Sequence, residues 1–83
     1  MKIVNLRKDL AFPDGDNVKY KRDIFAFIQD ETLNAEDLGL FITIASWDDG
    51  VSLEELSKCT PEPLEVTTKI LKKLKNLSFI DFE

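Results

Sequence analysis

Apolar and polar positions divide the chain into several short elements. Residues 3–6 are mostly apolar and predict a short strand, and Val18 and Tyr20 alternate with lysines as in a half-exposed strand. The segment 13–17 between them, Pro-Asp-Gly-Asp-Asn, is rich in turn-forming residues. We therefore expect the first twenty residues to form a loose hairpin, or an arm that pairs with another part of the fold.

Two helices are expected next. The segment 24–28, Ile-Phe-Ala-Phe-Ile, is too apolar for a free surface and predicts a short helix with Asp23 as its candidate N-cap. A longer helix from about Ala35 to Trp47 is indicated by Asn34, a favourable N-cap residue, followed by acidic residues in the first turn. Its apolar residues form two stripes: Leu38, Phe41, Ile42 and Ala45 in the first, and Leu40, Ile44 and Trp47 in the second.

A helix that is apolar over so wide an arc needs cover from two sides. The helices that follow supply one cover, and either the segment 24–28 or a partner subunit supplies the other. Gly39 lies inside this helix, where glycine is unfavourable relative to alanine, and we expect a closely packed neighbour to explain it. The second stripe, Leu40, Ile44 and Trp47, is a candidate partner interface, with the hydrophobic core as the more ordinary interpretation.

The second half of the chain predicts two further helices and a strand. Ser52 and Glu55 fit a capping box at the start of a short helix, which ends at the proline-containing segment 60–63. An amphipathic helix is expected at 62–76, and the alternating residues 78–83 predict a strand. This order of helix, tight turn, short helix, turn, longer helix and strand is that of a winged helix-turn-helix.

Particular motifs resemble the winged-helix family. The run Ser-Leu-Glu-Glu-Leu-Ser-Lys at 52–58, followed by Ile-Leu-Lys-Lys-Leu at 70–74 and Phe-Ile at 79–80, is similar to a pattern shared by many winged helices. The chain departs from that pattern at Ser78, where the family usually has Gly, and in the prolines of the preceding turn. The expected fold is mainly α, of the α+β type: a winged helix-turn-helix with three or four helices and a small antiparallel sheet.

Among winged helices, the stretches Leu-Gly-Leu-Phe-Ile at 38–42 and Trp-Asp-Asp-Gly-Val-Ser-Leu-Glu-Glu-Leu at 47–56 resemble the N-terminal domains of DnaD-like and phage replisome-organizer proteins. The resemblance implies a DNA-binding or oligomerising module of bacterial or phage replication or regulation, often the front part of a longer protein. A chain that stops at Glu83, where a wing hairpin would turn back, fits a truncated protein. It fits equally a complete protein whose N-terminal strand pairs with residues 78–82.

Composition narrows the domain organisation and the chemistry. We expect one winged-helix domain over 1–83, with a strand or arm at 1–22 and a helical core and C-terminal strand at 23–83. The absence of His and the single Cys remove most nucleophile–base pairs, nearly all transition-metal sites and any internal disulfide. We therefore expect no catalysis, no cofactor, no metal and no small-molecule substrate. No apolar run approaches the ~18 residues of a membrane span, so no membrane partner is expected.

The single cysteine also bears on the compartment. Secreted domains of this size usually need disulfides, so one Cys favours the reducing cytoplasm. No His exists to act as a base for Cys59, and we expect it to be a small buried packing residue.

Charge is segregated along a chain whose net charge is −5. Residues 1–22 carry six basic side chains against three acids, residues 23–65 carry eleven acids against one lysine, and residues 66–83 carry four lysines against two acids. If the helix at 62–76 is a recognition helix, its outward face and flanks offer these candidate contacts to double-stranded DNA: Lys58, Thr68, Lys69, Lys72, Lys73, Lys75 and Asn76. The negative net charge predicts weak and strongly salt-dependent binding.

A second function stays open beside DNA binding. Glu62 and Glu65 lie in the N-terminal turns that usually enter the major groove, and carboxylates repel phosphate. The lysines late in this helix also have an ordinary explanation, since they complement the helix dipole. The alternative is a protein–protein module, acting in oligomerisation or as an adaptor, inhibitor or DNA mimic, which binds a basic partner through these acids: Asp30, Glu31, Glu36, Asp37, Asp48, Asp49, Glu54, Glu55, Glu62 and Glu65.

Overall fold

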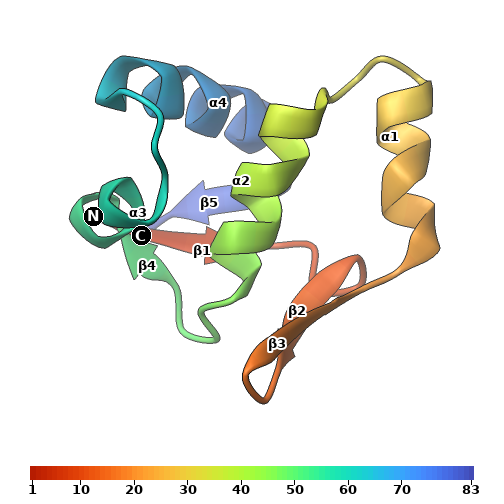
Figure 1. Cartoon of the computed structure of the whole chain (residues 1–83), viewed down its shortest axis with the longest axis horizontal. Helices are drawn as coiled ribbons and strands as arrows, with labels where there is room; N and C mark the ends of the chain where they lie inside the picture. The colour runs from red at the N-terminus through yellow and green to blue at the C-terminus, as the bar shows by residue number, and fades with distance from the viewer.

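The computed structural model describes all 83 residues as one α+β unit (Figure 1). The first third contains three strands, a 3-10 turn and a short helix: β1 (Lys2–Asn5), β2 (Ala11–Asp14), β3 (Asn17–Tyr20), η1 (Arg22–Phe25) and α1 (Ala26–Gln29). The remainder contains three helices and two strands: α2 (Ala35–Ala45), β4 (Val51–Ser52), α3 (Leu53–Cys59), α4 (Leu64–Asn76) and β5 (Ile80–Phe82). The expected α+β class, with several helices and little strand, is confirmed.

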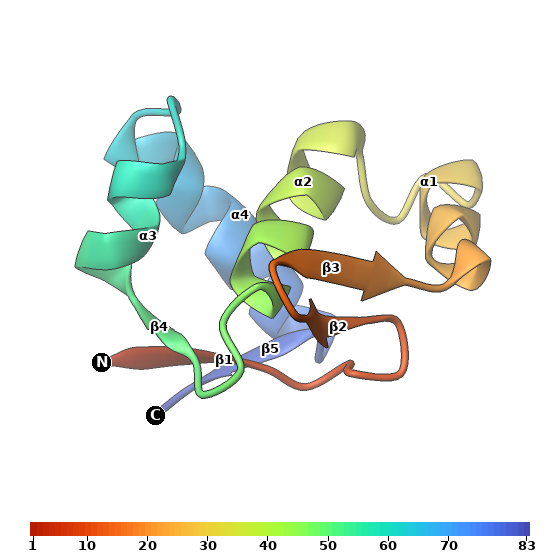
Figure 2. The same cartoon turned by 60° about the horizontal axis from the view of Figure 1, so that its bottom comes forward.

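Strand β1 is the middle strand of a three-stranded antiparallel sheet with the order β4-β1-β5. Ile3 pairs with Val51 on one side and with Phe82 on the other. Beyond this register Lys2 and Glu83 exchange two backbone hydrogen bonds of 2.7 Å, so the two ends of the chain lie side by side (Figure 2). The pairing of the N-terminal strand with the C-terminal one, which the sequence left open as one of two alternatives, is observed.

Strands β2 and β3 form a separate antiparallel hairpin. Asp14 pairs with Asn17 across a two-residue turn, in which Gly15 has a φ of 62°. A hairpin therefore forms around the predicted turn, but its first strand is β2, for which no strand was predicted, and not residues 3–6. The alternative, an N-terminal strand that pairs with another part of the fold, is what β1 shows.

Helix α2 lies at the centre of the molecule. It contacts β1, both strands of the hairpin, α3 and α4, and the hairpin lies on the opposite side of α2 from α3 and α4 (Figures 1 and 2). Phe41 and Ile44 are fully buried in its middle. Cover from two sides is confirmed. The sheet and the hairpin, which were not expected there, supply much of the second cover, and the expected segment 24–28 contributes Ile24 to the same core, with Phe27 and Ile28 packed against it.

The helix caps agree with the local sequence signals in part. Asn34 Oδ1 accepts a hydrogen bond from the Asp37 N–H at 2.8 Å, and the Asp37 carboxylate accepts one from the Asn34 N–H at 3.0 Å, which makes a full capping box at α2. At α3, only the bond from the Glu55 N–H to Ser52 Oγ forms, at 3.1 Å. The expectation of an N-cap at Asp23 is wrong, because this residue lies inside η1.

Gly50 and Gly39 differ in whether the surrounding structure requires a glycine. Gly50, between α2 and β4, has a φ of 95°, and a Cβ there would lie 2.8 Å from the carbonyl oxygen of Ile3. Only glycine lets this turn pass so close to β1. Gly39, inside α2, has nothing within 4 Å of the position a Cβ would take, so the closely packed neighbour we expected is absent. Helix α2 thus gives up about 1 kcal/mol relative to alanine with no packing reason within the chain.

Helix α4 ends in a Schellman motif centred on Ser78. The Phe79 N–H donates to the Leu74 carbonyl at 2.9 Å, and the Ser78 N–H donates to the Lys75 carbonyl at 3.0 Å. Ser78 has a φ of 63°, a conformation that costs a non-glycine residue about 1–2 kcal/mol. The backbone at Ser78 therefore has the left-handed conformation for which glycine is normally used.

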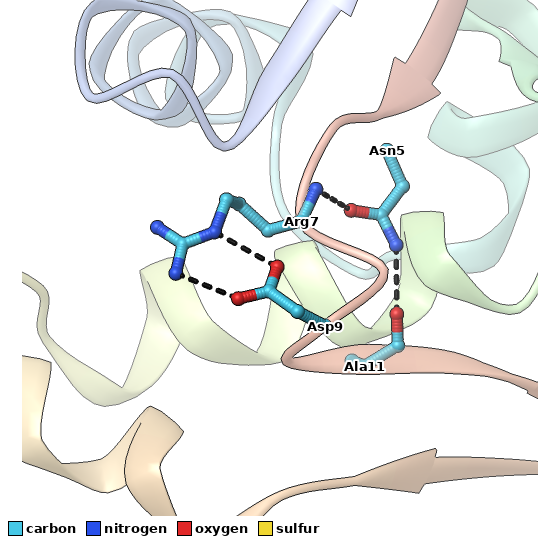
Figure 3. Close-up of polar contacts among 4 residues, drawn as sticks. All are labelled: Asn5, Arg7, Asp9 and Ala11. Carbon is cyan, nitrogen blue, oxygen red and sulfur yellow. Dashed lines mark hydrogen bonds and ion pairs between the residues drawn. The ribbon is translucent and has the colours of Figure 1, made fainter.

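Polar contacts hold the link from β1 to β2 (Figure 3). The buried Asn5 donates from Nδ2 to the Ala11 carbonyl at 2.8 Å and accepts from the Arg7 N–H at 2.8 Å. The Arg7 guanidinium binds both carboxylate oxygens of Asp9 at 3.0 Å and lies 5.5 Å from the centre of the Phe79 ring. This short loop is therefore ordered by side chains although it contains no regular structure.

We expect Gly50→Ala to lower the free energy of unfolding by about 3 kcal/mol or more, because the new Cβ meets the backbone of β1 in addition to an unfavourable φ. Gly15→Ala is the matched control. Gly15 also has a positive φ, but nothing lies within 4 Å of its Cβ position, so a loss of about 1–2 kcal/mol is expected. Urea unfolding measures both, and equal losses would show that the approach to β1 does not require glycine at position 50.

Candidate functional site

The outward face of α4 carries most of the candidate DNA contacts. The helix buries one side against the core through Thr67, Ile70, Leu71 and Leu74. Its opposite side exposes Glu65, Lys69, Lys72 and Asn76. No side chain caps its beginning, where Pro63 takes the N-cap position. Which of the candidate side chains are free to meet a partner depends on their contacts within the chain.

Lys73 is held by a buried carboxylate. Its Nζ lies 2.6 Å from Oδ2 of Asp37, whose side chain is only 3% exposed. The same oxygen accepts the Asn34 N–H, so Asp37 both caps α2 and neutralises Lys73. The pair joins the first turn of α2 to the end of α4. Lys73 is thus partly neutralised within the chain, which weakens the case for it as a DNA contact. The inclusion of Asp37 in an exposed acidic surface is corrected, because this side chain is buried.

Lys75 is engaged with β5. Its Nζ lies 2.8 Å from Asp81 Oδ1 and 5.0 Å from the centre of the Phe82 ring. The hydrogen bond from Lys75, together with one from the Phe82 N–H, lowers the pKa of the Asp81 carboxyl below its usual value. Lys75 therefore joins α4 to the sheet, and its charge is partly neutralised there, which weakens the case for it as a DNA contact.

The other five candidates differ in how free they are. Lys58 is exposed and lies 3.9 Å from Glu54 one turn earlier, a contact that contributes little. Thr68 donates from Oγ1 to the Leu64 carbonyl of its own helix at 2.8 Å. Three side chains are exposed and have no hydrogen-bond or ion-pair partner in the chain: Lys69, Lys72 and Asn76.

Ion pairing within the chain leaves an excess of unpartnered acids. Six ion pairs use six of the eleven basic side chains and six of the sixteen acids. Ten acids therefore have no partner, against five bases: Lys2, Lys21, Arg22, Lys69 and Lys72. The protein therefore offers a macromolecular partner about twice as many unpaired carboxylates as unpaired cations.

The surface is hollowed by one groove of 240 Å³, between α2 and the turn that joins α3 to α4. Glu36 on α2 and Glu62 in the turn between α3 and α4 both line the groove. The apolar residues Leu40 and Ile70 and the glycine Gly39 line it as well. Neither glutamate has an ion-pair partner. Spacing along the chain could not reveal this groove, because its walls come together only when α3 and α4 pack on α2. The one sequence signal for it is the glycine in the middle of α2.

The first turn of α4 follows the groove residues 59–62 closely in the chain. Leu64 is 56% exposed, and Glu65 beside it is exposed and without a partner. We name the groove together with Glu36, Glu62, Leu64 and Glu65 the groove surface. It combines free negative charge with exposed apolar area.

Two further expectations are corrected by burial. Ile44 is 0% and Leu40 7% exposed, so both belong to the core, and Trp47 is half-buried against the same core. These three side chains do not form a free partner interface. Cys59, which we expected to be buried, is exposed at the end of α3 and borders the groove.

Comparison with protein-family models, with curated proteins and with solved structures gives no match. None of the helices has the length and apolar character that crossing a membrane requires. No three His, Cys, Asp or Glu side chains are grouped so as to hold a metal ion.

We expect Lys73→Met to lower the free energy of unfolding by about 2–3 kcal/mol, because it leaves the buried Asp37 carboxylate without its cation. Lys72→Met on the same helix is the control and should change stability by no more than about 0.5 kcal/mol, since Lys72 is exposed and unpaired. Urea unfolding at neutral pH compares them. Equally small losses would show that the pair does not stabilise the fold.

Acid is expected to weaken the fold through Asp9 and Asp81. Hydrogen bonds from Arg7 and from Lys75 lower the pKa of these two carboxyls below the usual value of 3.8. The unfolded chain takes up both protons at a higher pH than the folded chain, so their contribution to stability is present above that usual value and is lost as the pH falls through the lowered values. The Asp9→Asn/Asp81→Asn variant should lose stability less steeply below about pH 4 in urea unfolding. An unchanged slope would contradict this account.

Proposed function

We propose that the protein is a winged-helix interaction module that binds a basic protein partner through the groove surface. The observation that carries the proposal is the first turn of α4 and the turn before it, where Glu62 and Glu65 have no partner and Leu64 is 56% exposed. In a helix-turn-helix protein bound to DNA, the beginning of the recognition helix contacts the bases. Carboxylates at that place oppose DNA, whereas acids beside an exposed leucine suit a basic and partly apolar protein segment.

The order and pairing of the elements support the winged-helix part of the proposal. Helix α2, strand β4, helices α3 and α4 and strand β5 follow in the order expected for that family. A winged helix continues from the last of these strands through a hairpin, the wing, into a strand that returns to the sheet. Here β1 lies antiparallel between β4 and β5 and fills the place of a returning strand. The left-handed Ser78, where the family motif has Gly, agrees with the same interpretation.

The balance of free charges supports a basic partner. Ten unpartnered acids against five unpartnered bases attract cationic surfaces and slow the approach of nucleic acid. We propose that such a module acts in the cytoplasm as an adaptor, as an inhibitor or by self-association. The resemblance to replication proteins fits such a role, since replication and regulation depend on protein contacts as much as on DNA contacts.

Binding of double-stranded DNA is the second candidate function. It is favoured by Lys69 and Lys72, which project from α4 without any partner in the chain, with Asn76 beyond them. Two free lysines hold few phosphates, so this binding would be weak and lost as salt is raised. It would use Lys69, Lys72 and Asn76, and none of these three lines the groove.

Amide NMR titrations of the labelled protein decide between the two functions. One titration uses a short peptide rich in arginine and leucine, and the other uses a mixed-sequence DNA duplex, each at low and at near-physiological salt. We expect the peptide to shift amides at the start of α2 and in the α3–α4 turn, and the variant Glu62→Lys/Glu65→Lys to weaken peptide binding about tenfold or more.

The matched variant is Lys69→Glu/Lys72→Glu, which reverses two charges on the same helix at residues that do not line the groove. It should leave peptide binding in place. A peptide that causes no shifts, or shifts that survive Glu62→Lys/Glu65→Lys, would overturn the protein-binding proposal. Duplex-induced shifts on α4 that disappear in Lys69→Glu/Lys72→Glu would establish the DNA function instead.

A further inference from the structure

Gly39 is a glycine without a structural reason in the chain. It lies on the exposed side of the regular helix α2, where it weakens the helix relative to alanine. A Cβ at this position would touch nothing within 4 Å, in contrast to Gly50, where it would meet the backbone of β1. A residue that weakens the free protein, and that no neighbour requires, points to something that lies against it in a complex.

The space beside Gly39 is the groove, and its chemistry is specific. Glu36 and Glu62 supply two free carboxylates, and Leu40 and Ile70 supply apolar atoms. The volume of 240 Å³ is below the range of about 300–1,000 Å³ typical of small-molecule pockets. The groove is therefore of a size to take one long side chain.

We infer that the groove at Gly39 receives a lysine or arginine side chain of the protein partner, an inference that rests on the proposed function. Lysine and arginine combine an apolar stem with a charged head. The stem packs against Leu40 and Ile70, and the head lies by Glu36 and Glu62. The missing Cβ of Gly39 lets the partner's backbone approach α2 closely.

The test measures stability and binding on the same variants of the full chain. Gly39→Ala should raise the urea midpoint of unfolding, because alanine favours the helix, and it should weaken binding of the arginine- and leucine-rich peptide. Gly39→Leu fills more of the groove and should weaken binding about tenfold or more. Ser57→Ala, a helix-favouring change in α3 outside the groove lining, is the control and should leave affinity unchanged. A peptide with glutamine in place of arginine should bind neither the parent protein nor the variants.

Each outcome bears on a different statement. If the unaltered protein does not bind the arginine peptide, the proposed function itself fails. If it binds, and Gly39→Ala and Gly39→Leu bind as well as the parent, the groove is not the site and only this inference is overturned. If Gly39→Ala lowers the urea midpoint, Gly39 serves the fold and the inference loses its basis. Where Gly39→Leu does not fold, as judged by circular dichroism, Gly39→Ala decides the question.

Discussion

The fold depends on one constraint: β1 must enter the sheet between two strands that come from much later in the chain. β4 and β5 are bonded to β1 and not to each other, so without β1 they would be two very short strands with no partner. Ile3 is fully buried at this junction, and the turn at Gly50 comes within contact of the Ile3 backbone. Helix α2 packs on β1, so the position of the central helix also follows from a few N-terminal residues.

The two halves of α4 have different roles. Toward its end, Lys73 and Lys75 bind carboxylates from α2 and β5, and these bonds fix the helix on the rest of the molecule. At its beginning, the carboxylates of Glu65 and of the preceding Glu62 have no hydrogen-bond or ion-pair partner within the chain. The lysines at the end of α4 are thus paired with carboxylates of α2 and β5, whereas the carboxylates before and at the beginning of the helix, near the groove, stay unpaired. A helix that looks basic in the sequence therefore presents a much less basic face.

Most local features were predictable from the sequence, and most features that join distant segments were not, apart from the pairing of β1 with β5. The N-cap at Asn34 and the periodic apolar residues of α2 depend on neighbours within one or two turns, and both appear as expected. The pairing of Lys73 with Asp37 could not be foreseen, because it depends on how α4 crosses the start of α2. The groove and the exposure of Cys59 have the same origin, since both are set by where α3 stops and turns back. The groove had one signal in the sequence, Gly39, because a glycine inside a helix is unfavourable and so stands out.

The hydrogen-bonded pair of Lys2 and Glu83 has a mechanical consequence. Because β1 and β5 are antiparallel, the first residue of the one and the last residue of the other lie at the same end of the ladder. A force that pulls Lys2 and Glu83 apart would act on the hydrogen bonds of one residue pair at a time, beginning with this pair. It would not act on all the hydrogen bonds between β1 and β5 at once. The sheet would peel from Lys2 toward Asn5 at low force. A molecule with a tightly packed centre is thus mechanically soft along the line that joins its ends.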